Sequence, residues 1–292
     1  MTELNAVLAA KLEKIYEWTS GRACVVAFSG GVDSATLAKV LMIAFQRGLL
    51  KVAPVGYFAE SATSTALERS EARRVANEIG LLLRTVESSE FDEPRFVENN
   101  PKRCYWCKRI RFSALKTLAQ REVGTPNQVE ITLVDGSNFD DNDDYRPGVQ
   151  AAREVGVVSP LAEVRLTKSE IRQLAEYWGL SVAQKPSTPC LATRIAYNIP
   201  LEDSILRKIE GAEIAIKELG ASTCRARVDA YDAVRIEVPE SEIKLFLNGD
   251  VRKKVVEALL KIGFNFISLD LEGFASGKNN RSIMNQSSSD LT

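Results

Sequence analysis

Residues 23–41 read Ala-Cys-Val-Val-Ala-Phe-Ser-Gly-Gly-Val-Asp-Ser-Ala-Thr-Leu-Ala-Lys-Val-Leu. An apolar run rich in β-branched residues (23–28) leads into a turn with two glycines, and a helical pattern (34–47) follows. Such a turn exposes backbone N–H groups at the start of a helix, where an anion is stabilised. We therefore predict a phosphate-binding loop between a strand and a helix.

The residue types in this turn suit a nucleotide with Mg²⁺. Gly30 and Gly31 allow the backbone to approach a phosphate without a Cβ in the way, and Ser29 and Ser34 add hydroxyl donors. Asp33 would repel phosphates unless a cation lies between them, so we assign it to Mg²⁺. The alternative is an ordinary strand–helix turn that contains two glycines.

The loop differs from two common nucleotide motifs. No lysine follows the glycines, as it would in a Walker loop, and the third glycine of a dinucleotide-binding motif is missing. The segment instead resembles the PP-loop of the ATP pyrophosphatases. The resemblance implies that ATP is cleaved between its α- and β-phosphates, with AMP transferred to a substrate oxygen.

Composition indicates a soluble globular protein. The chain has 292 residues, of which 45% are hydrophobic and 26% are charged. No apolar run approaches about 20 residues, and the N-terminus lacks the pattern of a signal peptide, so we expect a cytoplasmic protein without a membrane span. The net charge of −1 weakens the case for nucleic-acid binding. Histidine is absent, which excludes a His-based triad and a His-ligated zinc.

The alternation of strands and helices predicts an α/β fold with a doubly wound parallel sheet. After a leading helix (4–18), further strands are expected at 52–58, 81–86 and 129–135, with helices at 64–79 and 104–121 between them. A capping-box pattern at Thr167 starts another helix at 167–178. Ligands of such sheets bind beyond the carboxyl ends of the strands.

A breaker-rich stretch near residues 180–200 predicts a domain boundary. We assign 1–185 to the nucleotide-binding domain, 186–276 to a smaller α+β domain and 277–292 to a flexible tail. In the smaller domain we expect this order: helix 202–219, strand 223–229, strand 232–238, helix 240–261, strand 264–270.

The five cysteines fall into two groups. Cys24 and Cys224 lie in or beside strands and are expected in the core. Cys104 and Cys107 are one turn apart at the start of a helix, and Cys190 lies in a proline-flanked loop that can reach the same crevice. We favour a [4Fe–4S] cluster on these three thiolates, which leaves one iron without a protein ligand. A structural zinc, a redox pair at 104 and 107, and unconnected thiols are the alternatives.

Further polar groups follow the predicted strands. The acidic segment 138–148 contains four aspartates and Arg146, and it either helps to hold Mg²⁺ or forms a solvated turn. Arg225 and Arg227 alternate along one strand face and suit a phosphate or carboxylate, as does Arg194. The alternative is a strand face whose arginines pair with local acids.

Several segments together resemble the ATP-dependent sulfur transferases of nickel-pincer nucleotide biosynthesis, the LarE family, over residues 5–280. They are 27–34, 135–136, 142–148 (Asn-Asp-Asp-Tyr-Arg-Pro-Gly), 189–194 (Pro-Cys-Leu-Ala-Thr-Arg), 225–227 (Arg-Ala-Arg), 235–239 and 269–274. The PP-loop alone is shared by many enzymes, whereas the Asp-Tyr-Arg-Pro-Gly and Arg-Ala-Arg segments are more specific.

The resemblance implies a substrate and a chemistry. The substrate is a pyridinium mononucleotide with ring carboxylates; one carboxylate is adenylated by ATP, and sulfur then displaces AMP. One branch of the family sacrifices the sulfur of a cysteine at the position of Cys190, whereas this chain, with Cys104 and Cys107, is similar to the branch in which three cysteines hold a [4Fe–4S] cluster. Arg194, Arg225 and Arg227 would anchor substrate phosphate or pyrophosphate.

Other functions remain open from the sequence. A tRNA thiolase also combines a PP-loop with three cysteines, but should show a basic face; an amidating synthetase would leave the cysteines without a role. A nucleotide-sensing module would bind ATP or AMP without releasing pyrophosphate. The partners we expect are the mononucleotide, a sulfur donor (a protein or sulfide) and further copies of the chain in a homo-oligomer.

Overall fold

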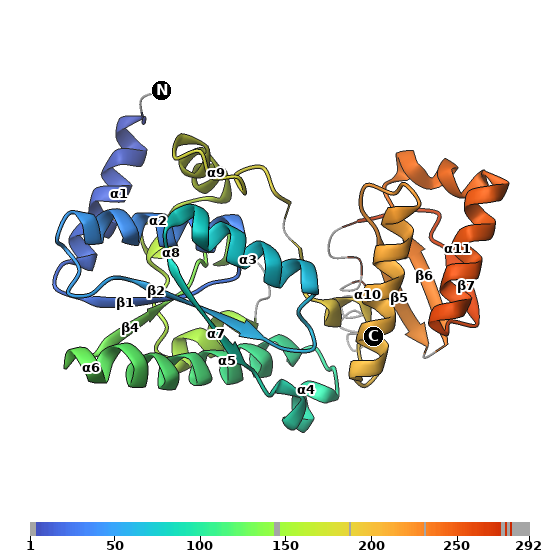
Figure 1. Ribbon diagram of the computed structural model, residues 1–292, viewed down its shortest axis with the longest axis horizontal. Helices are drawn as coiled ribbons and strands as arrows, with labels where there is room; N and C mark the ends of the chain where they lie inside the picture. Colours follow the sequence, from blue (N-terminus) through green and yellow to red (C-terminus); the bar gives the residue numbers. More distant parts are fainter. Residues whose placement is uncertain are drawn as a thin grey trace, which may run out of the picture. The chain divides into compact units, whose positions relative to one another are not determined.

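A computed structural model describes residues 4–142, 147–186, 188–230, 232–275, 278 and 281. By their contacts, the residues form two compact units (Figure 1). The first contains Met1–Glu93 and Cys104–Thr188, and the second contains Pro94–Arg103 and Pro189–Thr292. The short segment Pro94–Arg103 thus groups with residues almost a hundred positions further along the chain. The domain limits given above stay a prediction, and the predicted tail falls outside the described residues except for Lys278 and Arg281.

A four-stranded parallel sheet forms the centre of the first unit. Its strands are β1 (Ala23–Ala27), β2 (Val55–Glu60), β3 (Leu82–Glu87) and β4 (Ile131–Val134), in the order β3-β2-β1-β4. β1 pairs in parallel with both β2 and β4, and β2 pairs in parallel with β3. This arrangement confirms the predicted α/β class with a parallel sheet.

Helices cover both faces of this sheet (Figure 1). One face carries α1 (Ala6–Thr19), α2 (Val32–Gln46), α3 (Ala66–Ile79) and α9 (Lys168–Tyr177), and their apolar side chains pack with Cys24 and Val26. The other face carries α5 (Arg103–Ala119) and α7 (Pro147–Val155), whose side chains pack with Val25 and Leu133. Alternate residues of β1 therefore enter two separate cores, which explains why the strand is apolar throughout.

Short elements complete the first unit. They are a 3₁₀ turn at Glu90–Asp92, a π-helical turn at Gln120–Gly124, α6 (Thr125–Asn127), a 3₁₀ turn at Phe139–Asn142 and α8 (Pro160–Glu163). The capping box predicted at Thr167 is confirmed: its hydroxyl accepts from Glu170 N–H, and the Glu170 carboxylate accepts from Thr167 N–H.

The second unit has its own three-stranded sheet. Strands β5 (Arg225–Ala230) and β6 (Ala233–Glu237) are antiparallel, and β7 (Phe266–Leu269) pairs in parallel with β6. The other elements are α4 (Pro94–Val97), η4 (Leu191–Arg194), α10 (Asp203–Glu218), η5 (Glu240–Leu247) and α11 (Gly249–Ile262). Among the described residues of both units, every helix is too short or too polar to span a bilayer.

Candidate functional site

The glycine loop follows β1 at the carboxyl edge of the first sheet and is held by its own serines. Ser34, in the first turn of α2, lies with its Oγ 3.1 Å from Ser29 Oγ, and it donates to Gly31 O at 3.1 Å. Ser34 Oγ also accepts from Ser29 N–H at 3.2 Å. Gly31 is the N-cap of α2, and among the described residues no side-chain hydrogen bond is made at this cap. The geometry suits an anion at the helix start.

Two positions in this region require glycine for steric reasons. Gly30 has a φ of +73°, and a Cβ there would lie 2.7 Å from the backbone of Ala72 in α3. A Cβ on Gly136, after β4, would lie 2.7 Å from Ser34 N. Both positions therefore require glycine because backbone segments from α2, α3 and the β4 loop meet around the turn.

Asp33 is the acidic residue of the loop, and it is paired with two donors. Its Oδ2 accepts from Lys168 Nζ at 2.5 Å, and its Oδ1 accepts from Asn138 Nδ2 at 3.3 Å. The carboxylate is partly exposed, so it stays accessible from the solvent side. The predicted magnesium ligand is thus oriented toward the edge of the sheet and neutralised by a lysine.

Lys168 and Asn138 were not among the residues predicted for the site. Asn138 follows β4 at the carboxyl edge of the sheet, and Lys168, the first residue of α9, is near the loop at this edge because its ammonium contacts Asp33. Asp135, at the end of β4, accepts from Ser137 Oγ at 2.8 Å and Ser159 Oγ at 2.6 Å, which makes it a support of this turn. Lys168 directly follows the predicted capping residue Thr167, and this position at a helix start could have marked it as a candidate binding residue.

A second polar cluster lies after β2. Arg111 of α5 donates from Nη2 to Ser61 Oγ at 2.7 Å and Thr63 Oγ1 at 2.8 Å, and it forms an ion pair with the buried Glu90. Cys107 Sγ lies 3.8 Å from Glu90 Oε1. One of the predicted thiol ligands therefore lies beside a buried carboxylate that sequence reasoning had not identified.

The five cysteines are all free thiols, and their exposure separates them as predicted. Burial raises the pKa of Cys24 and of Cys224 to about 12, so both stay protonated in the core. Cys104 is exposed, while Cys107 and Cys190 are partly exposed. Only these last three are placed to meet an external partner.

Arg194 holds the loop that carries Cys190. Its Nη1 donates to Pro189 O at 2.5 Å and to Cys190 O at 3.1 Å, and its other nitrogens bind the Glu213 carboxylate at 2.8 and 3.1 Å. Arg194 is 1% exposed. The donors of this arginine are used inside the second unit, which makes it a support for the Cys190 loop.

Arg225 and Arg227 are both buried in β5 but differ in their partners. Arg227 forms an ion pair with Glu237 at 3.0 Å and donates to Thr193 O at 2.7 Å. Arg225 donates to Cys224 O at 3.0 Å and lies over the ring of Phe274, and no carboxylate among the described residues forms an ion pair with it. Burial, and then repulsion by Arg194, lower the pKa of Arg225, as expected for a guanidinium that lacks a direct counter-charge.

The segment before Cys104 is anchored in the second unit. Asn99 is fully buried and donates from Nδ2 to the carbonyls of Ala196 and Ile199, both at 2.8 Å. Arg103 Nη1 donates to Asn99 Oδ1 and, at 3.0 Å, to Ala192 O. Ala192 is two residues after Cys190, and Cys104 directly follows Arg103.

The acidic segment is only partly described. Asp140 accepts from Lys168 N–H at 2.8 Å, and Asp141 accepts from Asn138 N–H at 3.0 Å, so these two aspartates stabilise the turn. Asp143, Asp144, Tyr145 and Arg146 lie outside the described residues.

Comparison with known proteins identifies the relatives of this chain. It is 35% identical over 277 residues to an uncharacterized protein of Synechocystis sp., a match that covers 94% of this chain and 98% of that protein. It is 30% identical over 279 residues to the pyridinium-3,5-bisthiocarboxylic acid mononucleotide synthase of Lactiplantibacillus plantarum, covering 96% and 94%. The chain belongs to the family of this synthase. An uncharacterized protein of Methanocaldococcus jannaschii is 26% identical over 252 residues, covering 86% and 90%, and no protein-family model matches.

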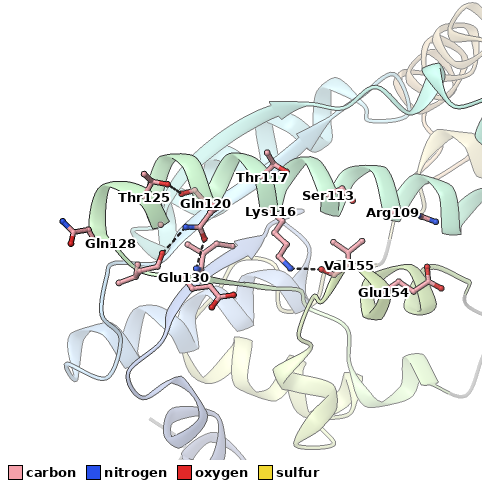
Figure 2. Close-up of a pocket in the computed structure, with 13 residues that line it drawn as sticks. Arg109, Ser113, Lys116, Thr117, Gln120, Thr125, Gln128, Glu130, Glu154 and Val155 are labelled. Atoms are coloured by element: carbon pink, nitrogen blue, oxygen red, sulfur yellow. Dashed lines mark hydrogen bonds between the residues drawn. The ribbon is translucent and has the colours of Figure 1, made fainter.

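A groove of about 980 Å³ lies elsewhere on the first unit of this synthase-family chain (Figure 2). Lys116 of α5 reaches across it to donate to Val155 O at 2.9 Å, and Gln120 donates to Val129 O at 3.2 Å. It extends to Ile131, the first residue of β4, whereas the glycine loop follows the last residue of β1. Because β1 and β4 are parallel, this end of the groove lies at the opposite edge of the sheet from the loop.

Thiolates are the ligands that iron–sulfur clusters prefer, and the three exposed or partly exposed cysteines fit such a group by their chemistry. Within the described part of the chain, no three cysteine or carboxylate side chains lie together in a way that could hold one metal ion. Two of the thiols belong to the first unit and one to the second. The three-cysteine site of this family member therefore stays a prediction.

Proposed function

We propose that this chain is an ATP-dependent sulfur transferase that converts a ring carboxylate of a pyridinium mononucleotide into a thiocarboxylate. The observation that carries the proposal is the full-length similarity to a pyridinium-3,5-bisthiocarboxylic acid mononucleotide synthase. The loop at the carboxyl edge of the sheet and Arg225 of β5 would supply binding groups that this reaction needs.

The proposed first step activates the carboxylate. A carboxylate oxygen attacks the α-phosphorus of ATP, and the bond to the β-phosphate oxygen breaks to release pyrophosphate. The substrate is already ionised at neutral pH, so no general base is required, in agreement with the absence of histidine. In the second step, a sulfur nucleophile attacks the acyl carbon and AMP leaves with the electron pair of the C–O bond.

The glycine loop would bind the ATP phosphates in this scheme. Ser29, Gly30, Gly31 and Ser34 offer hydroxyl and backbone donors, and Asp33 would help to hold the Mg²⁺ that accompanies ATP. Charge that develops on the departing pyrophosphate is then stabilised by donors that are already oriented.

Cys104, Cys107 and Cys190 would hold a [4Fe–4S] cluster in this proposal. When bound, such a cluster supplies an iron without a protein ligand, at which a transferable sulfide can be held. Within the second unit, Arg103 donates to Ala192 O and so helps to hold the loop that carries Cys190. Arg194 would fix the Cys190 backbone through the Pro189 and Cys190 carbonyls.

The proposal is tested with anoxically purified full-length protein, ATP, Mg²⁺ and pyridinium-3,5-biscarboxylic acid mononucleotide. We expect equal amounts of AMP and pyrophosphate, a thiocarboxylate product detected by mass spectrometry, and about four irons per chain with matching labile sulfide. Pyrophosphate without thiocarboxylate would restrict the function to adenylation. Iron-free protein that still forms the thiocarboxylate would contradict the cluster.

Arg225 is the arginine we expect to contact the substrate phosphate. Arg225→Gln should raise the KM for the mononucleotide by about 10- to 100-fold, because a charge-assisted bond to a buried guanidinium is lost, and should leave the KM for ATP nearly unchanged. Steady-state kinetics with each substrate varied in turn measures both values. Arg207→Gln, on the exposed side of α10, is the matched control. A larger effect on ATP than on the mononucleotide would assign Arg225 to the nucleotide instead.

A further inference from the structure

We infer that Lys168 and a divalent metal ion compete for Asp33, and that Lys168, once displaced, binds the phosphates of the nucleotide. The lysine thus neutralises Asp33 in the nucleotide-free protein and contributes its charge to phosphate binding when Mg²⁺ takes over the carboxylate. This inference rests on the proposed use of ATP and assigns a role to a residue outside the loop.

The contacts around Asp33 are the first observation. Lys168 Nζ lies 2.5 Å from Asp33 Oδ2, and Asp33 is two residues after Gly31, in the first turn of α2. A lysine ammonium in this place lies beside the loop that would bind phosphate. It therefore needs only rotations of its own side chain to change from the carboxylate to a phosphate oxygen.

The backbone of Lys168 is held firmly, so the movement is confined to the side chain. Its N–H donates to Asp140 Oδ2 at 2.8 Å, and the capping box of Thr167 and Glu170 fixes the start of α9. Lys11 of α1 binds the Glu170 carboxylate at 2.6 and 2.7 Å, which connects this helix start to the body of the unit. A flexible four-carbon stem on a fixed backbone allows an ammonium to exchange partners.

The exposure and the other contact of Asp33 also favour such an exchange. The side chains of Lys168 and Asp33 are 30% and 26% exposed, and an ion pair with this exposure is weak because water screens it. Asn138 holds the other carboxylate oxygen at 3.3 Å and would keep Asp33 oriented after the lysine has left. A divalent ion carries twice the charge of the ammonium and can bind several oxygens, so it replaces the lysine when phosphate is present to receive it.

Metal binding to the nucleotide-free, full-length protein tests the competition without any need for activity. Mn²⁺ is titrated and the free ion is measured by electron paramagnetic resonance. Lys168→Met should bind Mn²⁺ about tenfold more tightly than the unsubstituted protein, because the competing charge is gone. Lys185→Met is the matched control, since Lys185 forms an ion pair of similar exposure with Glu71, and it should not change the affinity. Adding Asp33→Asn to Lys168→Met should remove this gain in Mn²⁺ affinity.

Kinetics provides the second measurement. Lys168→Met should reach half-maximal pyrophosphate release at a lower Mg²⁺ concentration, while kcat falls about 100-fold through the loss of a charge at the phosphates. Equal Mn²⁺ affinity for Lys168→Met and Lys185→Met would overturn the inference even if the unsubstituted enzyme is active. If the unsubstituted enzyme releases no pyrophosphate, the proposed function fails, whereas the Mn²⁺ comparison still decides whether lysine and metal compete.

Discussion

Asp33→Asn should lower the rate of pyrophosphate release by about 10²- to 10³-fold while leaving the fold intact. Asparagine keeps the size and one oxygen of the side chain but loses the charge that would hold Mg²⁺ beside the ATP phosphates. Asp33 is partly exposed and its ion pair with Lys168 is screened by water, so the stability of the protein should change little. Initial rates at saturating Mg²⁺ and ATP measure the loss.

Glu13→Gln is the control for this substitution. Glu13 lies on α1 and pairs with Arg47 at the surface, and its replacement removes the same charge far from the loop. We expect its activity to equal that of the unsubstituted protein. Full activity in Asp33→Asn would remove the metal-binding role of Asp33 and leave the loop serines and backbone as the phosphate site.

Glu213→Gln should destabilise the second unit by about 3–5 kcal/mol, the cost of leaving one member of a buried ion pair unpaired. Glu213 is 6% exposed and Arg194 is 1% exposed, so water cannot replace the lost carboxylate charge. In the unsubstituted protein, Glu213 Oε1 accepts a hydrogen bond from Ala226 N–H at 3.2 Å. Glutamine can still accept this bond, so the expected loss of stability comes from the missing charge. Because Arg194 also holds the Pro189 and Cys190 carbonyls, the Cys190 loop should lose order as well.

Urea unfolding followed by far-UV circular dichroism measures this loss. All three tryptophans, at 18, 106 and 178, belong to the first unit, so their fluorescence would not report on the second. Hydrogen exchange of peptides from α10 and β5 locates the effect. Asp203→Asn, an exposed carboxylate on the same helix, should change the free energy of unfolding by less than about 1 kcal/mol. Equal stability of the two variants would mean that the Arg194–Glu213 pair contributes no net stabilisation.

Local patterns predicted most of the elements. The apolar run at 23–28, the charged helix at 64–79 and the helix that starts with Cys104 all appear within a few residues of their expected limits. The deviations have local causes. β2 starts at Val55 rather than at residue 52 because Pro54 has no N–H to donate, and the helix predicted at 240–261 is divided at Asn248, which caps α11 by accepting from Asp250 and Val251 N–H. The π-helical turn at Gln120–Gly124 was not predicted.

The sequence by itself determined the glycine loop, the parallel α/β sheet and the difference between core and accessible cysteines, because each depends on residue type and spacing over a short stretch. Only the tertiary structure showed that Lys168 contacts Asp33, 135 positions away in the sequence, and that Arg103 binds the loop of Cys190. It also showed that Arg194 and Arg227 have buried carboxylate partners, whereas Arg225 forms no ion pair with a carboxylate among the described residues. Long-range pairs of this kind leave no periodic pattern, since which donor meets which acceptor is settled by how the strands and helices pack.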